Sequence, residues 1–317
     1  MNYSIVFYII GWIPNFEAAF MALPTAVALI YRESEVWCFL ATMAVCLMVG
    51  MLLVRRKPKN QIFYVAESFV AVSLSWVLLS VMGAAPFVLS GYIPNPIDAL
   101  FETVSGFTTT GASILSSVEQ LPNCLLFWRS FTHWIGGMGV LVFLLSVLPM
   151  VGGSHMNLMK AESPGPIVSR LVPKVQMTAK LLYQIYLGMT ILEAVILILG
   201  KMPIFDAITI TVGTAGTGGF AIRNDSLASY TAFQKNVVTV FMILFGVNFN
   251  FYFFLLMRKI GQAFKMQEVR AYFLIIASAV GIITVNITLR QCTAGIPGCG
   301  IPGRFGYHDD RLRHGGF

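Results

Sequence analysis

The sequence predicts an all-α integral membrane protein built from repeated helix–re-entrant helix–helix units. Of the 317 residues, 57% are hydrophobic and only 11% are charged, whereas soluble domains carry about 25% charged residues. Several apolar segments reach the length of about 20 residues that crosses a bilayer. A short polar pattern also occurs twice, 108 residues apart, each time between such segments.

Seven segments are long and apolar enough to span a membrane. They are residues 3–31, 36–54, 62–90, 124–150, 181–200, 232–257 and 271–289. The first contains Pro14 and Pro24, near one of which we expect a bend. It lacks a positively charged start and an A-x-A-like cleavage site, so we expect a retained helix rather than a signal peptide.

The basic residues predict the orientation of these spans. The connections at 55–59, 151–180 and 258–270 hold twelve Lys and Arg residues, and those at 31–35, 84–123 and 201–235 hold four. Cytoplasmic loops carry the excess of Lys and Arg, so the second set of connections is expected outside. The net charge of +7 therefore relates to topology and anionic lipids, and no basic tract with interleaved aromatics indicates a nucleic-acid partner.

Two of the outer connections contain a semi-apolar stretch that is too short to cross the bilayer. These stretches are Pro96–Phe107 and Pro203–Thr214. Each begins with proline, which is harmless at a helix start, and each has an Asp in or near its first turn, which favours the helix dipole. Segments of about 10–14 apolar residues suit re-entrant elements, so we expect two short helices that enter the membrane and return.

The two stretches align without gaps and share the pattern D-A-x3-T-V-x4-T-x-G. The matched residues are Asp98-Ala99 with Asp206-Ala207, Thr103-Val104 with Thr211-Val212, Thr109 with Thr217, and Gly111 with Gly219. An apolar segment containing glycine follows each copy. Internal repeats are common in transporters, where the binding site lies at the repeat interface.

The Thr/Gly loop after each short helix predicts a cation site. A helix that runs inward points its partially negative C-terminal end at the membrane centre. The loop then offers carbonyl and hydroxyl oxygens, which replace the hydration shell of a monovalent cation. Gly111, Gly218 and Gly219 permit the backbone angles that turn carbonyls inward. A divalent ion would call for several carboxylates, and Glu102 is a single one.

The segments "FETVSGFTTTGAS", "FDAITITVGTAGTGGFAIRNDS", "KAESPGPI" and "LPTAVALIYRES" closely resemble bacterial Trk-type potassium uptake proteins of the Trk/Ktr/HKT superfamily. The resemblance reaches about residue 290 and implies four repeats around one pore, each donating one filter segment. The residues that match the K⁺ filter are Thr108, Thr109, Thr110, Gly111, Gly216, Thr217, Gly218 and Gly219. On the same basis we expect the pairs Thr109/Thr110 and Thr217/Gly218 to contact the ion.

The resemblance also implies the setting of the protein. It predicts potassium uptake across the bacterial inner membrane, electrophoretic or as a symport, with K⁺ as the transported ion and no organic cofactor. It predicts a homodimer and a cytosolic nucleotide-binding regulatory subunit on the inner loops. The alternatives are a non-conducting truncated fragment and a relative permeable to both sodium and potassium.

The expected organisation has two complete repeats of four. Residues 1–57 form an N-terminal two-helix hairpin, 58–160 the first pore repeat with its filter at 108–112, and 161–265 the second with its filter at 215–219. Residues 266–291 form the first helix of a third repeat, and a glycine-rich tail occupies 292–317. We therefore expect a C-terminally truncated form with little independent transport.

Three interpretations of the tail compete. Cys292, Cys299, His308 and His314 could form a metal site, or the tail could be a disordered or interaction segment. The third interpretation, a shifted reading frame, is the one we favour. Codons can be chosen for Tyr307–Phe317 so that a one-base shift reads I-M-T-T-G-F-A-T-A-D, a filter-like segment near the place where a third is due.

A few other residues carry expectations. Gly246 and Asn248, with Asn250, would line the pore below the second filter or hydrogen-bond between helices. Arg129 and His133 are expected at the membrane interface. No Ser/His/Asp set, H-E-x-x-H motif or Walker loop occurs, so an enzyme is not expected.

Overall fold

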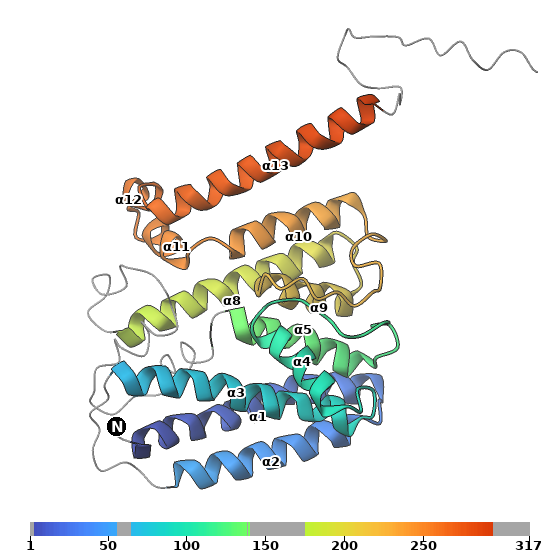
Figure 1. Cartoon of the computed structure of the whole chain (residues 1–317), viewed down its shortest axis with the longest axis vertical. Helices are drawn as coiled ribbons and strands as arrows, with labels where there is room; N and C mark the ends of the chain where they lie inside the picture. Colours follow the sequence, from blue (N-terminus) through green and yellow to red (C-terminus); the bar gives the residue numbers. More distant parts are fainter. Residues whose placement is uncertain (1–2, 56–64, 138, 140–174, 294–317) are drawn as a thin grey trace, which may run out of the picture. The chain divides into compact units, whose positions relative to one another are not determined.

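The computed structural model describes residues 3–55, 65–137, 139 and 175–293. All regular elements in this part of the chain are helices, which confirms the predicted all-α membrane class (Figure 1). The chain divides into two units, residues 1–260 and 261–317. The tail residues 294–317, and the expected inner loop at 151–174, lie outside the described residues.

The described residues of the first unit form nine helices up to Leu256, four of them long. They are α1 (Tyr3–Tyr31), α2 (Val36–Val54), α3 (Val65–Leu89), α4 (Pro96–Phe107), α5 (Asn123–Gly137), α8 (Val175–Leu199), α9 (Ile204–Ala215), α10 (Ala232–Phe245) and α11 (Phe249–Leu256). Helices α1, α2, α3 and α8 are each long and apolar enough to cross a membrane. The short helices are α4 and α9; α5 is described up to Gly137, and most of the remainder of the expected span 124–150 lies outside the described residues.

Helices α1 and α2 pack closely because glycine lies where they cross. A Cβ at Gly11 would lie 2.6 Å from Cβ of Leu53, and a Cβ at Gly50 would overlap the side chain of Asn15. Both Pro14 and Pro24 lie inside α1, which continues through them as one helix. Prolines are tolerated in membrane helices where neighbouring helices and side chains compensate.

The outward faces of these helices are apolar. Trp37 is 76% exposed, Ile30 75% and Leu52 64%. Exposed apolar surface of this kind would be a liability in water, whereas lipid tails solvate it. Buried apolar residues of α1, α3, α4 and α5 form one continuous core behind that surface.

The two short helices match each other in length and position. Each has twelve residues, and both the start and the end of α9 lie 108 residues after those of α4. Asn95 caps α4 by accepting a hydrogen bond from the Ile97 amide, 3.1 Å away, with Pro96 in the first turn. Pro203 instead precedes α9 as its N-cap, so the expected range Pro203–Thr214 is shifted by one residue.

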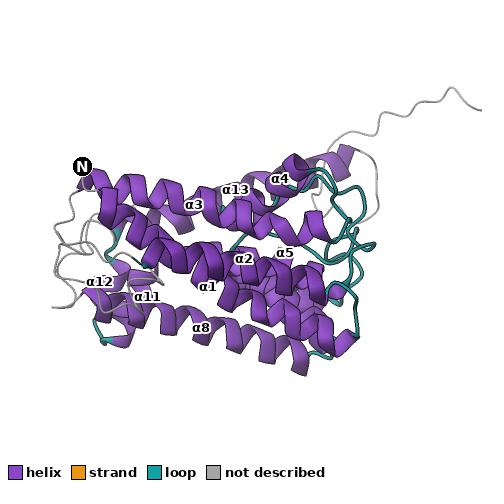
Figure 2. Cartoon of the chain, turned by 90° about the horizontal axis from the view of Figure 1, so that it is seen from below, coloured by secondary structure: helices purple, strands orange, loops and turns teal. Residues whose placement is uncertain are grey.

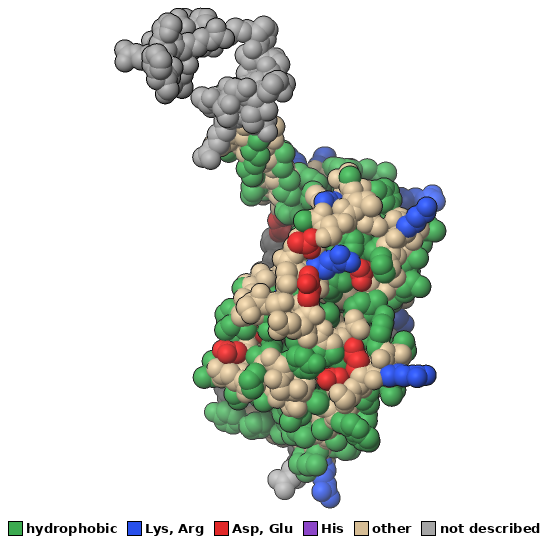
Figure 3. Space-filling view, turned by 90° about the vertical axis from the view of Figure 1, so that its right-hand side faces the viewer, with side chains coloured by type: hydrophobic (Ala, Val, Ile, Leu, Met, Phe, Trp, Pro, Cys, Tyr) green, Lys and Arg blue, Asp and Glu red, His purple; other side chains and the backbone are tan. Residues whose placement is uncertain are grey.

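The loops after α1, α4 and α9 gather at one end of this unit (Figures 1 and 2). Hydrogen bonds join them: Glu33 accepts from the Asn123 amide at 2.7 Å, and Asn224 accepts from the Val118 amide at 2.8 Å. Three connections that the basic residues assign to one side of the membrane therefore lie together. Figure 3 looks onto this end, where charged side chains stand among polar and apolar ones.

The expected span 232–257 is wrong as a single helix. It breaks between α10 and α11, whose axes differ by 87°. Gly246 ends α10, and the Asn248 side chain caps α11 by accepting from the Asn250 amide at 3.0 Å. An Asx cap competes with continued helix, so Asn248, two residues after Gly246, starts a new helix.

The second unit is described by two helices, α12 (Ile260–Phe264), which begins at its boundary, and α13 (Gln267–Thr293). The most apolar 18-residue window within Gln267–Leu289 of α13 has a mean hydropathy of 2.1, and none of that window is buried by other residues. The predicted span 271–289 thus lies within a longer apolar helix.

Candidate functional site

Each expected filter segment begins where a short helix ends in the same cap. In both, the backbone amide two residues after the last helical residue donates to the helix carbonyl three residues before it. The next amide donates to the carbonyl five residues before it, and the two bonds together form a Schellman motif. The bonds are Thr109 N to Gly106 O (3.0 Å), Thr110 N to Ser105 O (2.9 Å), Thr217 N to Thr214 O (2.7 Å) and Gly218 N to Gly213 O (3.4 Å). The second pair repeats the first at an offset of 108.

The backbone angles repeat in the same way. Thr109 and Thr217 have φ of 55° and 53°, and Gly111 and Gly219 have φ of 76° and 83°. Positive φ is routine for glycine but a genuine outlier for a β-branched residue such as threonine. Two strained threonines at matched positions support the interpretation of the segments as structural repeats. Such strain persists where the surroundings enforce it, and it clusters at functional sites.

The structure brings the two segments together. A Cβ on Gly111 would overlap the carbonyl oxygen of Gly218, so the loops touch backbone to backbone at this point. Among the eight expected filter residues, Thr108, Thr110, Thr217 and Gly219 are exposed, Thr109, Gly111 and Gly218 are half-buried, and Gly216 is buried. The loops therefore leave oxygen-bearing groups accessible beside their shared contact.

The threonine hydroxyls are in part already engaged. The Thr108 hydroxyl donates to the Val104 carbonyl at 2.7 Å and lies 2.8 Å from the Thr110 hydroxyl. Of the two, Thr110 is thus held by a neighbouring hydroxyl, and Thr108 by the end of α4. The oxygens most suited to a cation here are backbone carbonyls, with hydroxyls as additional ligands.

Helix α5 forms the wall on which both segments rest. A Cβ on Gly136 would overlap the Phe107 carbonyl, a Cβ on Gly216 would overlap the His133 carbonyl, and a Cβ on Gly137 would lie 2.8 Å from Gly216. Small residues allow helix and loop backbones to approach this closely. The glycines of α5 therefore position the segments, which sequence periodicity alone does not reveal.

Arg129 and His133 are buried within the protein. Arg129 is 4% exposed and His133 is fully buried, and their expected position at the membrane interface stays a prediction. His133 stacks on Phe220 with ring centroids 4.0 Å apart, and Arg129 forms an ion pair with buried Glu102. Partners on α4 and on the second loop thus accommodate the Arg129 guanidinium, whereas neither ring nitrogen of His133 has a hydrogen-bond partner among the described residues.

The protein backbone contributes to the electrostatics of the site. The C-terminal ends of α4 and α9, which carry partial negative charge, lead into the two touching loops. Near the second loop, Asp206 accepts a hydrogen bond from the Tyr230 hydroxyl at 2.8 Å. Burial, followed by that hydrogen bond, raises the pKa of Tyr230 to about 12, so this hydroxyl remains a donor at neutral pH.

Gly246 and Asn248 lie at the break between α10 and α11, away from the end where the loops after α1, α4 and α9 gather in Figure 1. Asn248 caps a helix there, so its side chain serves the backbone. Their expected role in lining a pore stays a prediction. The expected tail metal site cannot be assembled from the described part of the chain, because Cys299, His308 and His314 lie outside it.

The chain is similar to known transporters over most of its length. Residues 36–291 match the model of the TrkH family, described as cation transport proteins. The "Trk system potassium uptake protein TrkH" of Salmonella typhimurium is 34% identical over 292 residues, which are 90% of this chain and 60% of the relative. The "Trk system potassium uptake protein TrkG" of Escherichia coli is 32% identical, over 88% of this chain and 59% of the relative.

A solved structure agrees with the sequence relatives. The crystal structure of the potassium transporter TrkH from Vibrio parahaemolyticus matches with a TM-score of 0.76 and 29% sequence identity, covering 92% of this chain and 60% of that one. This chain thus spans about 60% of the length of the relatives that it matches.

Proposed function

The chain belongs to the TrkH family of cation transport proteins, and from this premise we propose that it takes part in potassium uptake through a filter of carbonyl and hydroxyl oxygens. It is a multi-pass protein of the bacterial inner membrane, and α1, α2, α3, α8 and α13 are each long and apolar enough to cross it. The filter residues we propose are Thr108 to Gly111 and Gly216 to Gly219.

One observation carries this proposal: two touching Thr/Gly loops with the same positive-φ pattern, each following the C-terminal end of a short helix. None of the eight residues bears a carboxylate, which a hard divalent ion would call for. Neutral oxygens at the negative ends of helices instead suit a dehydrated monovalent cation. The named relatives are potassium uptake proteins.

We propose the repeat boundaries with the function, at residues 58–160 and 161–265. Each repeat contributes one filter segment to a ring of four. The remaining segments would come from a second copy or from further chain of the same kind. The homodimer, the cytosolic nucleotide-binding subunit on the inner loops and the outward-facing filter loops belong to this proposal, and the Trk resemblance supports them.

Potassium binding to the purified chain tests the proposal directly. A ligand that binds only the folded state adds about 2.7 kcal/mol of stability at 100 times its dissociation constant. We expect the Tm in detergent to be higher in K⁺ than in choline at equal ionic strength. An equal gain in Na⁺ would identify a sodium/potassium-permeable relative, and identical Tm values in all three salts would contradict the filter.

A matched pair of glycine variants localises the binding. Gly219→Ala strains a filter position whose φ is +83°, and Gly188→Ala changes a helical glycine of α8; neither Cβ meets a neighbour within 4 Å. We expect the potassium effect to be lost in Gly219→Ala and kept in Gly188→Ala. Growth of a potassium-uptake-deficient strain at low potassium then separates a conducting form from a non-conducting fragment that only binds the ion.

A further inference from the structure

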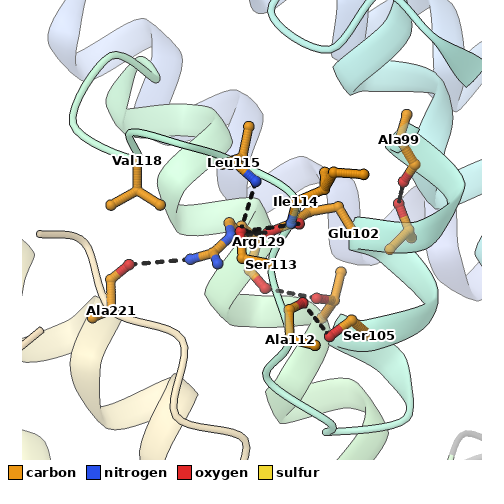
Figure 4. A network of polar contacts seen from close by, with 12 residues as sticks. Ala99, Glu102, Ser105, Ala112, Ser113, Ile114, Leu115, Val118, Arg129 and Ala221 are labelled. Carbon is orange, nitrogen blue, oxygen red and sulfur yellow. Dashed lines mark hydrogen bonds and ion pairs between the residues drawn. The ribbon is translucent and has the colours of Figure 1, made fainter. Parts of the chain in front are cut away.

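A buried ion pair lies between the two chain segments that directly follow the proposed filter residues. Glu102 of α4 is 1% exposed and Arg129 of α5 is 4% exposed, and Arg129 Nε donates to Glu102 Oε1 (Figure 4). Burying two charges costs so much desolvation energy that well-packed apolar residues often stabilise a fold equally or better. Stability alone therefore does not explain the pair.

Glu102 also holds the first loop. Its carboxylate accepts from the Ser113 hydroxyl at 3.0 and 3.2 Å and from the Ile114 amide at 3.1 Å. Ser113 and Ile114 come two and three residues after Gly111. The carboxylate thus ties the residues that follow the first filter segment to the short helix that precedes that segment.

Arg129 holds the second loop with the remainder of its guanidinium group. Its Nη1 donates to the Ala221 carbonyl at 3.1 Å, and its Cζ lies 3.5 Å from the ring centroid of Phe220. Phe220 and Ala221 directly follow Gly219. Figure 4 shows the side chain between the two loops, with Glu102 on one side and Ala221 on the other. The planar fork of arginine suits two acceptors at once.

The matching positions of the second repeat carry no charged pair. Ile210 stands 108 residues after Glu102, and α10, the counterpart of α5, carries Val237 and Val238. Ile210 and Val238 belong to one buried apolar cluster, against which Val237 packs. The repeat therefore folds with apolar residues at these places, and the charged pair of the first repeat is an addition to that pattern.

We propose that Glu102 and Arg129 are positioning residues that tie the second filter loop to the first and so fix the spacing of their carbonyl oxygens around the ion. This inference rests on the proposed potassium filter. Selectivity by a carbonyl site depends on the number and placement of its oxygens. A tie that spans both loops sets that placement without contacting the ion.

Two variants separate positioning from folding. In Glu102→Leu/Arg129→Met, apolar residues of similar size replace the pair, which conserves packing and removes every polar contact that the pair makes with the two loops. Arg129→Lys keeps a charge beside Glu102, but one ammonium group lacks the fork that reaches both Glu102 and the Ala221 carbonyl. We expect both variants to fold, the double variant with a Tm at or above that of the parent chain, and both to lose the tie.

Cysteine oxidation measures the tie without any transport. The Ser117 hydroxyl and the Asn224 side-chain amide lie 3.1 Å apart across the loops. In a Ser117→Cys/Asn224→Cys background the side-chain hydrogen bonds of Asn224 are lost, while the backbone amide at position 224 still reaches Glu119 and Arg129 remains as the side-chain tie. We expect disulfide formation to slow several-fold when either pair variant is added, with the single-cysteine chains as controls. An unchanged rate in both variants would overturn the proposal.

Thermal unfolding in K⁺ and in Na⁺ then tests ion selectivity. In the parent chain we expect a larger Tm increase in K⁺ than in Na⁺, and in the double variant a smaller difference between the two ions. Slower oxidation with an unchanged ion difference would overturn the link between the tie and the site. If the parent chain itself shows no K⁺ effect, the proposed function fails, and the oxidation rate still decides whether the tie exists.

Discussion

At the scale of single residues, the site depends on two threonines in a conformation that threonine avoids. Thr109 and Thr217 have positive φ, at a cost of about 1–3 kcal/mol each. Glycine is the usual residue at this position of a Schellman cap. A threonine adds a hydroxyl oxygen beside the carbonyls, which a cation site can use. Its retention at both matched positions is therefore better explained by ligand chemistry than by folding.

Gly111 and Gly219 offer a matched comparison. Both have positive φ, but a Cβ on Gly111 would overlap the Gly218 carbonyl, whereas a Cβ on Gly219 meets open space. We expect Gly219→Ala to lower the free energy of unfolding by about 1 kcal/mol, from backbone strain alone. Gly111→Ala adds a steric clash and should cost clearly more.

Thermal unfolding of the two glycine variants in detergent measures this difference. Gly91→Ala is a control outside the filter, because Gly91 also has positive φ and open space around its missing Cβ. Equal losses of stability in Gly111→Ala and Gly219→Ala would show that the two loops do not touch.

The buried pair shows the limit of sequence reasoning at this scale. Glu102 and Arg129 lie 27 residues apart, on different helices. No local period links them, so the sequence does not reveal that they pair. The available signal was a charged residue in an otherwise apolar helix, which favours a buried functional or paired group.

At the scale of elements, α5 is held at its start by a carboxylate from another part of the chain. Glu33, in the loop between α1 and α2, accepts from the amides of Asn123 and Cys124 at 2.7 and 2.9 Å. The first amides of a helix lack internal partners, and a negative charge there also favours the helix dipole. This contact anchors the helix on which both filter segments rest.

Removal of this cap should therefore weaken the site region. We expect Glu33→Ala to lower the free energy of unfolding by about 1–2 kcal/mol, measured by thermal unfolding. Glu35→Ala is the matched control, since Glu35 accepts from the neighbouring Ser34 hydroxyl and does not cap α5. A larger effect of Glu35→Ala would contradict the assignment of the cap.

The break between α10 and α11 gives a second element-scale prediction. Asn248 accepts from the Asn250 amide and begins α11. We expect Asn248→Ala to cost about 1 kcal/mol and Asn248→Asp to cost less, because aspartate caps as well as asparagine. Equal destabilisation by both substitutions would indicate a role for the Asn248 amide nitrogen instead of the cap.

At the scale of the whole molecule, the sequence predicted the membrane spans and the short helices better than it predicted breaks within helices and contacts between elements. Apolar length located the spans of α1, α2 and α13, since lipid imposes a simple requirement on composition. The 108-residue repeat located both short helices to within one residue. The bend at Gly246–Asn248 was missed, because apolar composition on both sides hides a local cap. The packing of α5 glycines against the loops was missed because it depends on tertiary contact.

The orientation of the molecule is the last prediction. The distribution of basic residues places the connection that contains Ala228 outside the cell and the turn that contains Lys259 in the cytoplasm. Both residues are exposed, so a cysteine at either position can react. In spheroplasts, a membrane-impermeant maleimide should label the Ala228→Cys variant directly and the Lys259→Cys variant only after lysis.

The parent chain, with its native cysteines, gives the background of that labelling. The reverse pattern would place the Thr/Gly loops at the cytoplasmic face. The short helices would then direct their C-terminal ends inward from the cytosol, and the proposed filter would meet potassium leaving the cell before potassium entering it. Labelling therefore tests whether the filter stands at the outer end of the pathway, where an uptake protein must select its ion.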